Sequence, residues 1–213
     1  MNLEQKLKIL LNKLSTGNFD DVIFEATYLN KKHPEQEIFY NLLSLGYQGK
    51  GEYEKSIDLL ENALKKSKNN INFLNNLGLS YYKKKDYNPA EKYFLKVLEI
   101  KPNYINTLNN LAALYEEINH VKKSEDLLKK SIKINSEVIE TNYNLASLLQ
   151  SIGKFDEAKI YYKKTLEIDE NFTKADRGIA MLEKYNSSND HIKIMEKKIK
   201  NEKLHKSKII DLS

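Results

Sequence analysis

Cysteine and the helix-breaking residues are scarce in this chain of 213 residues. It contains no cysteine, no tryptophan, three prolines and seven glycines. The absence of cysteine excludes a disulfide framework, a thiolate zinc site and a cysteine nucleophile. So few prolines and glycines leave too few turns for a β-sandwich or a β-barrel, and the composition is typical of an all-α protein.

Arginine is nearly absent as well, because of 35 basic residues only Arg177 is an arginine. Lysine is a solvated point charge without the bidentate fork of arginine, so a net charge of +5 does not by itself predict nucleic-acid binding. No apolar run approaches the roughly 18 residues of a membrane span. The stretch 1–17 is interrupted by charges every few residues, unlike a signal peptide. We therefore expect a cytoplasmic protein that binds neither nucleic acid nor membrane.

What the chain does contain is a repeat with a period of 34 residues. The sequence NNLGLSYY at 75–82 returns as NNLAALYE at 109–116. When units are counted from residues 37, 71, 105 and 139, small residues recur at positions 8 and 20 and a large residue recurs at position 24. In unit order these residues are Ser44, Gly78, Ala112 and Ala146 at position 8, Ser56, Ala90, Ser124 and Ala158 at position 20, and Leu60, Phe94, Leu128 and Tyr162 at position 24.

This spacing predicts a pair of amphipathic helices in each unit. Positions 4, 7, 8 and 11 lie on one stripe of a first helix, and positions 17, 20, 24 and 27 lie on one stripe of a second. Small residues at positions 8 and 20 let the two helices cross closely. The stretches 49–53, 84–88 and 152–156 are polar or glycine-bearing breaks between them. Because one pair cannot bury its apolar face alone, the pairs must stack into a superhelical solenoid.

The pattern resembles the tetratricopeptide repeat (TPR) family, most closely at 75–103, where Gly78, Tyr81, Ala90 and Pro102 stand in the family's places. The resemblance implies antiparallel helix pairs that bind proteins. The expected units are a degenerate repeat at 3–36, full repeats at 37–70, 71–104, 105–138 and 139–172, a degenerate capping repeat at 173–206, and a tail at 207–213 that reads like the start of a further helix in a longer protein.

The segment 178–199 carries a second resemblance, to the TPR arm of bacterial proteins that join such an arm to a sulfotransferase domain. Ala180, Leu182, Tyr185 and Met195 are among the matching residues. An alternative function is therefore that of a substrate-recruiting arm of a larger transferase, of the sulfotransferase or glycosyltransferase type.

No constellation of catalytic residues is found. The stretch 46–53 lacks the GKS or GKT ending of a phosphate-binding loop and follows a helix instead of a strand. The four histidines share no ligand spacing. We expect no enzymatic activity, no cofactor, no metal and no small-molecule site in these residues.

The resemblance implies that positions 2, 5, 6, 9 and 12 of the first helices line a concave groove. Asparagines gather there: Asn76, Asn110 and Asn144 at position 6, Asn41, Asn75 and Asn109 at position 5, and Asn72 and Asn106 at position 2. A carboxamide can pair with both the N–H and the C=O of a peptide unit without reading its side chain. The row is similar to the asparagine ladder in the TPR arm of O-linked N-acetylglucosamine transferases.

These asparagines predict a groove that holds the backbone of an extended peptide or partner segment, which would make the chain a non-catalytic interaction scaffold. The competing explanation is that asparagine is common at position 6 across the family and that an AT-rich genome raises its frequency everywhere. Tyr82, Tyr143, Glu116, Glu117 and Gln150 would make the groove polar with aromatic patches. In this family, the clamp that holds the terminal carboxylate of chaperone tails uses an asparagine at position 9. No full repeat of this chain has an asparagine there, so the resemblance does not imply that clamp.

The solenoid architecture predicts an elongated particle. A compact chain of this length would have a radius of gyration of about 17 Å. A stacked array of helix pairs must exceed that value clearly, and small-angle X-ray scattering measures it. A radius at or below the compact figure would contradict a solenoid.

Overall fold

A computed structural model describes residues 2–182 and 190–200 of the chain. The all-α class is confirmed, because helices and short turns alone make up the described residues. In chain order the helices are α1 (Leu3–Ser15), α2 (Phe19–Lys32), α3 (Glu37–Gly49), α4 (Tyr53–Lys66), α5 (Ile71–Lys83), α6 (Tyr87–Ile100), α7 (Ile105–Glu117), α8 (Val121–Ile134), α9 (Ile139–Ser151), α10 (Phe155–Ile168), α11 (Thr173–Leu182) and α12 (Asp190–Lys200).

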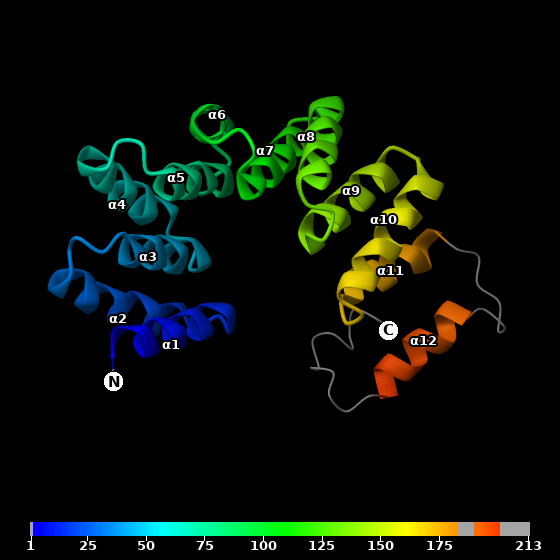
Figure 1. The fold of residues 1–213 in the computed structure, drawn as a ribbon, viewed down its shortest axis with the longest axis horizontal. Helices are drawn as coiled ribbons and strands as arrows, with labels where there is room; N and C mark the ends of the chain where they lie inside the picture. Colours follow the sequence, from blue (N-terminus) through cyan, green and yellow to red (C-terminus); the bar gives the residue numbers. More distant parts are fainter. Residues whose placement is uncertain (1, 183–189, 201–213) are drawn as a thin grey trace. The chain divides into compact units, whose positions relative to one another are not determined.

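The chain divides into two compact units, Met1–Asn110 and Leu111–Ser213, with the division inside α7. In the first unit each helix from α1 to α5 packs against the next one along the chain. The odd-numbered helices also pack against one another, α1 on α3 and α3 on α5 (Figure 1). The first helices of successive pairs therefore form one row, as stacked pairs require.

The second unit is built in the same way. Helix α9 packs against α8 and α10, and α10 also packs against α11 (Figure 1). Helix α12 is tied to α11 by an ion pair in which Lys198 Nζ lies 2.7 Å from Asp176 Oδ2. The expected tail at 207–213 lies outside the described residues.

Within five successive pairs, the turn between the two helices has one conformation. Position 15 has a positive φ of 60° to 78° each time, and this residue is Gly17, Gly51, Lys85, Asn119 or Gly153. The next residue donates its backbone N–H to the carbonyl five residues earlier, as Glu52 does to Tyr47 and Asp86 does to Tyr81. This is a Schellman motif, which satisfies the last carbonyls of the first helix and reverses the chain. Glycine suits the site because it reaches positive φ without steric cost.

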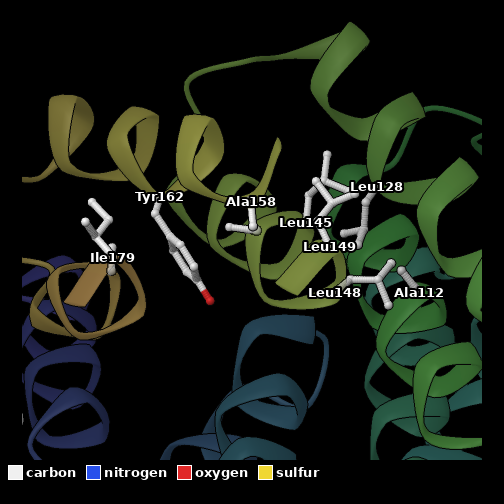
Figure 2. Close-up of a cluster of buried hydrophobic side chains, with 10 residues drawn as sticks. Ala112, Leu128, Leu145, Leu148, Leu149, Ala158, Tyr162 and Ile179 are labelled. Carbon is white, nitrogen blue, oxygen red and sulfur yellow. The ribbon is translucent and has the colours of Figure 1, made fainter. Parts of the chain in front are cut away.

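The small positions where the paired helices cross are fully buried, as the period predicts. Ala112, Ala146 and Ala158 have no exposed surface, and the facing Leu128 and Tyr162 are almost as completely covered (Figure 2). At Gly78, an added Cβ would lie 2.7 Å from Cε1 of Phe94. The large residue at position 24 therefore occupies the space that the small residue at position 8 leaves.

The first helices are buried over a wider arc than the expected stripe. Positions 3 and 10 are also buried, for example Phe73 and Ser80 in α5. A first helix contacts its own partner and the first helices on either side, which accounts for the extra buried positions. Position 17 is less buried than expected, and Phe155 is 55% exposed. It is the first residue of the second helix, where neighbouring helices cover only part of a side chain.

Substitution at a helix crossing should destabilise the fold. Ala112→Leu and Ala146→Leu should each lower the free energy of unfolding by about 1–3 kcal/mol, because a fully packed crossing cannot accept the larger side chain. Lys133→Leu on exposed surface of α8 is the matched control and should be nearly neutral. Chemical denaturation measures all three, and equal midpoints would show that the crossing positions are assigned wrongly.

Candidate functional site

A hollow of about 490 Å³ opens on the second unit between α9 and α11. Helix α9 contributes positions 5, 9, 12 and 13, helix α11 contributes positions 2, 5, 6 and 9, and α10 contributes one residue. These residues are Tyr143, Ser147, Gln150, Ser151, Tyr162, Lys174, Arg177, Gly178 and Met181. The hollow is therefore formed largely by the positions that the family resemblance assigns to the groove.

Tyr162 of α10 reaches into this hollow from the core. Its side chain is only 3% exposed, and its hydroxyl donates a 2.6 Å hydrogen bond to Gln150 Oε1. Burial, and then the neighbouring Tyr143, raise the pKa of Tyr162 to about 12, so the hydroxyl is neutral at physiological pH. A Cβ at position 178 would clash with the ring of Tyr162, and Gly178 therefore permits this close approach.

Aromatic rings form one wall of the hollow. The ring of Tyr143 lies 5.9 Å from that of Tyr162 and 5.2 Å from that of Phe172, both in tilted arrangements. Such pairs hold a ring in one orientation. Gln150 accepts from Tyr162 through its oxygen, which leaves its amide N–H groups for a ligand.

The charged residues of the hollow are both basic. Lys174 and Arg177 are exposed, and neither has an acidic partner within residues 2–182 and 190–200. Arg177 is the single arginine of the chain. Arginine offers a planar fork that pairs with carboxylate or phosphate oxygens, so this site can bind an anionic group.

In the first unit, the groove asparagines pair with each other across neighbouring first helices. Asn76 Nδ2 of α5 donates to Asn41 Oδ1 of α3 at 3.0 Å, and Asn110 Nδ2 of α7 donates to Asn75 Oδ1 of α5 at 3.1 Å. Asn75 Oδ1 also accepts from the Thr107 hydroxyl at 2.7 Å. A position-6 carboxamide thus pairs with the position-5 carboxamide of the preceding repeat.

A second polar contact joins α3 to α5 at position 12. Gln48 Nε2 donates to the backbone carbonyl of Asn76 at 3.0 Å and to Ser80 Oγ at 2.8 Å. The Ser80 hydroxyl lies 2.8 Å from that of Ser56 in α4. These bonds fix the backbone on which the asparagine row stands.

Several of the groove asparagines are partly or almost wholly covered by the adjacent helix. Asn75 is only 7% exposed, and Asn41, Asn76 and Asn110 are half-buried. The sequence pattern cannot show this, because the burial comes from carboxamides and hydroxyls of the adjacent helix.

The surroundings of the remaining predicted site residues differ from one to the next. Asn72 and Asn106 are exposed at the beginnings of α5 and α7, and Asn72 accepts from the Tyr104 hydroxyl at 3.0 Å. Tyr82 is half-buried near the end of α5, with its ring 6.2 Å from that of Tyr87. Asn109 and Asn144 are half-buried in α7 and α9.

The sequence pattern does not single out Lys174, Arg177, Ser147 and Met181 as site residues. Lys174, Arg177 and Met181 stand at positions 2, 5 and 9 of the degenerate last repeat, and Ser147 stands at position 9 of the repeat before it. The groove numbering, continued into the last repeat, identifies the first three. The second resemblance, at 178–199, includes residues outside the described ones and stays a prediction.

No group of three or more histidine, aspartate or glutamate side chains in the described part of the chain could hold a metal ion. None of the helices in that part is both long enough and apolar enough to span a bilayer.

Removal of the Asn75 carboxamide should destabilise the first unit. Asn75→Ala leaves the buried Thr107 hydroxyl and one Asn110 N–H without their acceptor, so the free energy of unfolding should fall by about 1–3 kcal/mol. Asn106→Ala, at an exposed position, is the control and should be nearly neutral. If both variants unfold at the wild-type denaturant concentration, the carboxamide pairs do not stabilise the stack.

Models of the tetratricopeptide repeat match residues 71–104 and 139–172, and a model described as TPR repeat matches residues 47–85. No curated protein matches the chain.

Solved structures show the same fold. A thermophilic TPR protein of Thermus thermophilus, TTC0263, aligns over 84% of this chain and 97% of its own, with a TM-score of 0.76 and 17% identity. Pseudomonas aeruginosa PilF aligns over 84% of this chain and 82% of its own, with a TM-score of 0.67 and 18% identity.

The first TPR of Spaghetti (RPAP3), solved with the HSP90 peptide SRMEEVD, aligns over 51% of this chain and 86% of its own, with a TM-score of 0.50 and 20% identity. Three matches to models of the repeat and the stacked helix pairs agree. The chain is therefore a tetratricopeptide repeat protein, with matched repeats within residues 47–104 and 139–172.

Proposed function

We propose that the row of first helices binds an extended segment of a partner protein. TPR proteins are interaction scaffolds in general, and the observation that carries the proposal for this chain is the hollow between α9 and α11. It has a volume of about 490 Å³ and is lined by groove positions that bear hydrogen-bonding, aromatic and basic groups. A side chain of a bound segment would enter it.

In the first unit, the asparagines would hold the backbone of an extended segment. The Nδ2 groups of Asn76 and Asn110 are engaged by the preceding repeat, and this fixes the direction of each carboxamide. Within the described residues no donor reaches their Oδ1 atoms, which can therefore accept a peptide N–H. A group held in its binding orientation before the ligand arrives costs less entropy on binding.

The spacing of the carboxamides suits an extended chain. Neighbouring first helices pack about 8–10 Å apart, and an extended peptide rises about 3.3 Å per residue. One carboxamide per helix would therefore contact about every third residue of the ligand. The peptide bound to the RPAP3 domain is a precedent within the fold for an occupant of this kind.

Removal of the position-6 carboxamides should weaken binding. In the triple variant Asn76→Ala, Asn110→Ala, Asn144→Ala, each lost hydrogen bond should cost about 0.5–1.5 kcal/mol, so affinity should fall very roughly ten- to a thousandfold. Peptides selected by the wild-type chain from a random dodecapeptide library serve as the probe, and isothermal titration calorimetry measures the affinity.

Two controls accompany this variant. Asn88→Ala removes an exposed carboxamide at the start of α6, outside the first-helix row, and should bind as wild type does. Because Asn76 and Asn110 also join neighbouring helices, the folded fraction of each variant must be measured by circular dichroism. Undiminished affinity in a folded triple variant would remove these asparagines from the binding site.

A further inference from the structure

The groove of the second unit has charges of opposite sign at its two ends. Lys174 and Arg177 stand at the α11 end of the hollow. Glu116 and Glu117 end α7 at positions 12 and 13 and are exposed. In α9 the same position 12 is occupied by Gln150, which lines the hollow. The two glutamates therefore continue the groove one helix beyond the hollow.

Two observations place Glu116 on this surface. The preceding turn of α7 belongs to the same buried cluster as α9, through Ala112. The charge of Glu116 is also one of the influences that raise the pKa of Tyr162, whose ring reaches into the hollow.

Glu116 is available to a cation. No basic partner occupies it within the described residues, and it remains accessible to solvent. The surrounding protein displaces part of its hydration and Glu117 adds repulsion, and both raise the pKa of its carboxyl group. A cationic side chain of a ligand would relieve this repulsion.

The helix dipoles strengthen the separation of charge. Lys174 and Arg177 lie in the first two turns of α11, where the dipole is positive, and Glu116 and Glu117 lie in the last turn of α7, where it is negative. The dipole of each helix therefore adds to the charge of its side chains, while Glu140 at position 2 of α9 places a negative charge between α7 and α11.

We propose that this groove selects a peptide segment that carries a basic residue against α7 and an acidic residue against α11. The proposal rests on the proposed peptide-binding function and names the chemistry of its ligand. Helices α7 and α11 are separated by two helix spacings, about 16–20 Å. Glu116 at position 12 and Arg177 at position 5 are also offset by seven positions, about 10 Å along the helix axes. An extended ligand covers this diagonal when its two charged residues are about six positions apart in its sequence.

The ligand side chains between the two charged residues must fit the lining of the hollow. They would cross the hollow, where Tyr143 and Met181 offer apolar surface and Gln150 offers amide donors. An apolar or aromatic residue next to the acidic residue fits this lining.

An array of 14-residue peptides tests the proposal. Each peptide carries one Lys and one Asp in a background of Ala, Ser, Leu and Tyr, with every spacing and both orders represented. The wild-type chain should retain peptides whose charges are about six residues apart in one order, at least about tenfold over the reversed order. Retention should fall with added salt, because exposed charges are screened.

A charge-reversed chain makes the test specific. Glu116→Lys, Glu117→Lys, Lys174→Glu and Arg177→Glu together leave the net charge unchanged, and all four side chains are exposed. This variant should retain the opposite order of charges. The control pair Asp58→Lys and Lys92→Glu, at exposed positions of the second helices α4 and α6, should keep the wild-type preference.

The outcomes separate the two proposals. Retention of peptides without any preferred order, or the same order in the wild-type and charge-reversed chains, would overturn the charge-ordered groove and leave peptide binding standing. Retention of no peptide by any folded chain would overturn both.

Discussion

The packing of each first helix on both sides is the constraint on which the rest of the structure depends. In α5, residues at positions 3, 4, 7, 8 and 10 are buried between α3, α4 and α6. Only a narrow strip of each first helix then remains open, and it includes positions 2, 6, 9 and 12. A ligand that binds the first helices must contact this strip, and the hollow between α9 and α11 is lined by residues at these positions and at the neighbouring positions 5 and 13.

The period of 34 residues makes the fold predictable because the two helices of each repeat pack against each other at the same positions. The alternation of Gly78 with Phe94 and of Ala146 with Tyr162 is enough to identify the helix crossings, and both pairs are buried where the period places them. The turn is less visible in the sequence. Lys85 and Asn119 take the positive φ that glycine takes in the other repeats, so the glycine signal is lost in the two central turns although the Schellman bonds persist.

Most of the candidate site could not be predicted, because it depends on how side chains of neighbouring helices meet. The repeat pattern places Asn75 in open groove, yet its oxygen accepts two hydrogen bonds from α7 and is nearly covered. A sequence pattern gives the face of a helix but not the reach of a carboxamide on the next helix. The carboxamides of Asn76 and Asn110 would therefore have two roles. Their Nδ2 hydrogen bonds hold neighbouring first helices together, and the same bonds orient the Oδ1 atoms that we propose accept from a ligand.

In the proposed groove, stability and recognition would be coupled at α11 as well. Asp176 stands at position 4, a core position, and its fully buried carboxylate pairs with Lys198 of α12. A buried carboxylate without its partner would be strongly destabilising, so Lys198 of α12 stabilises the position in which Asp176 is buried. Successive residues of a helix point about 100° apart, and the rotation that buries Asp176 turns the next residue, Arg177, toward the groove. Helix α12 therefore contributes to the basic end of the groove without lining it.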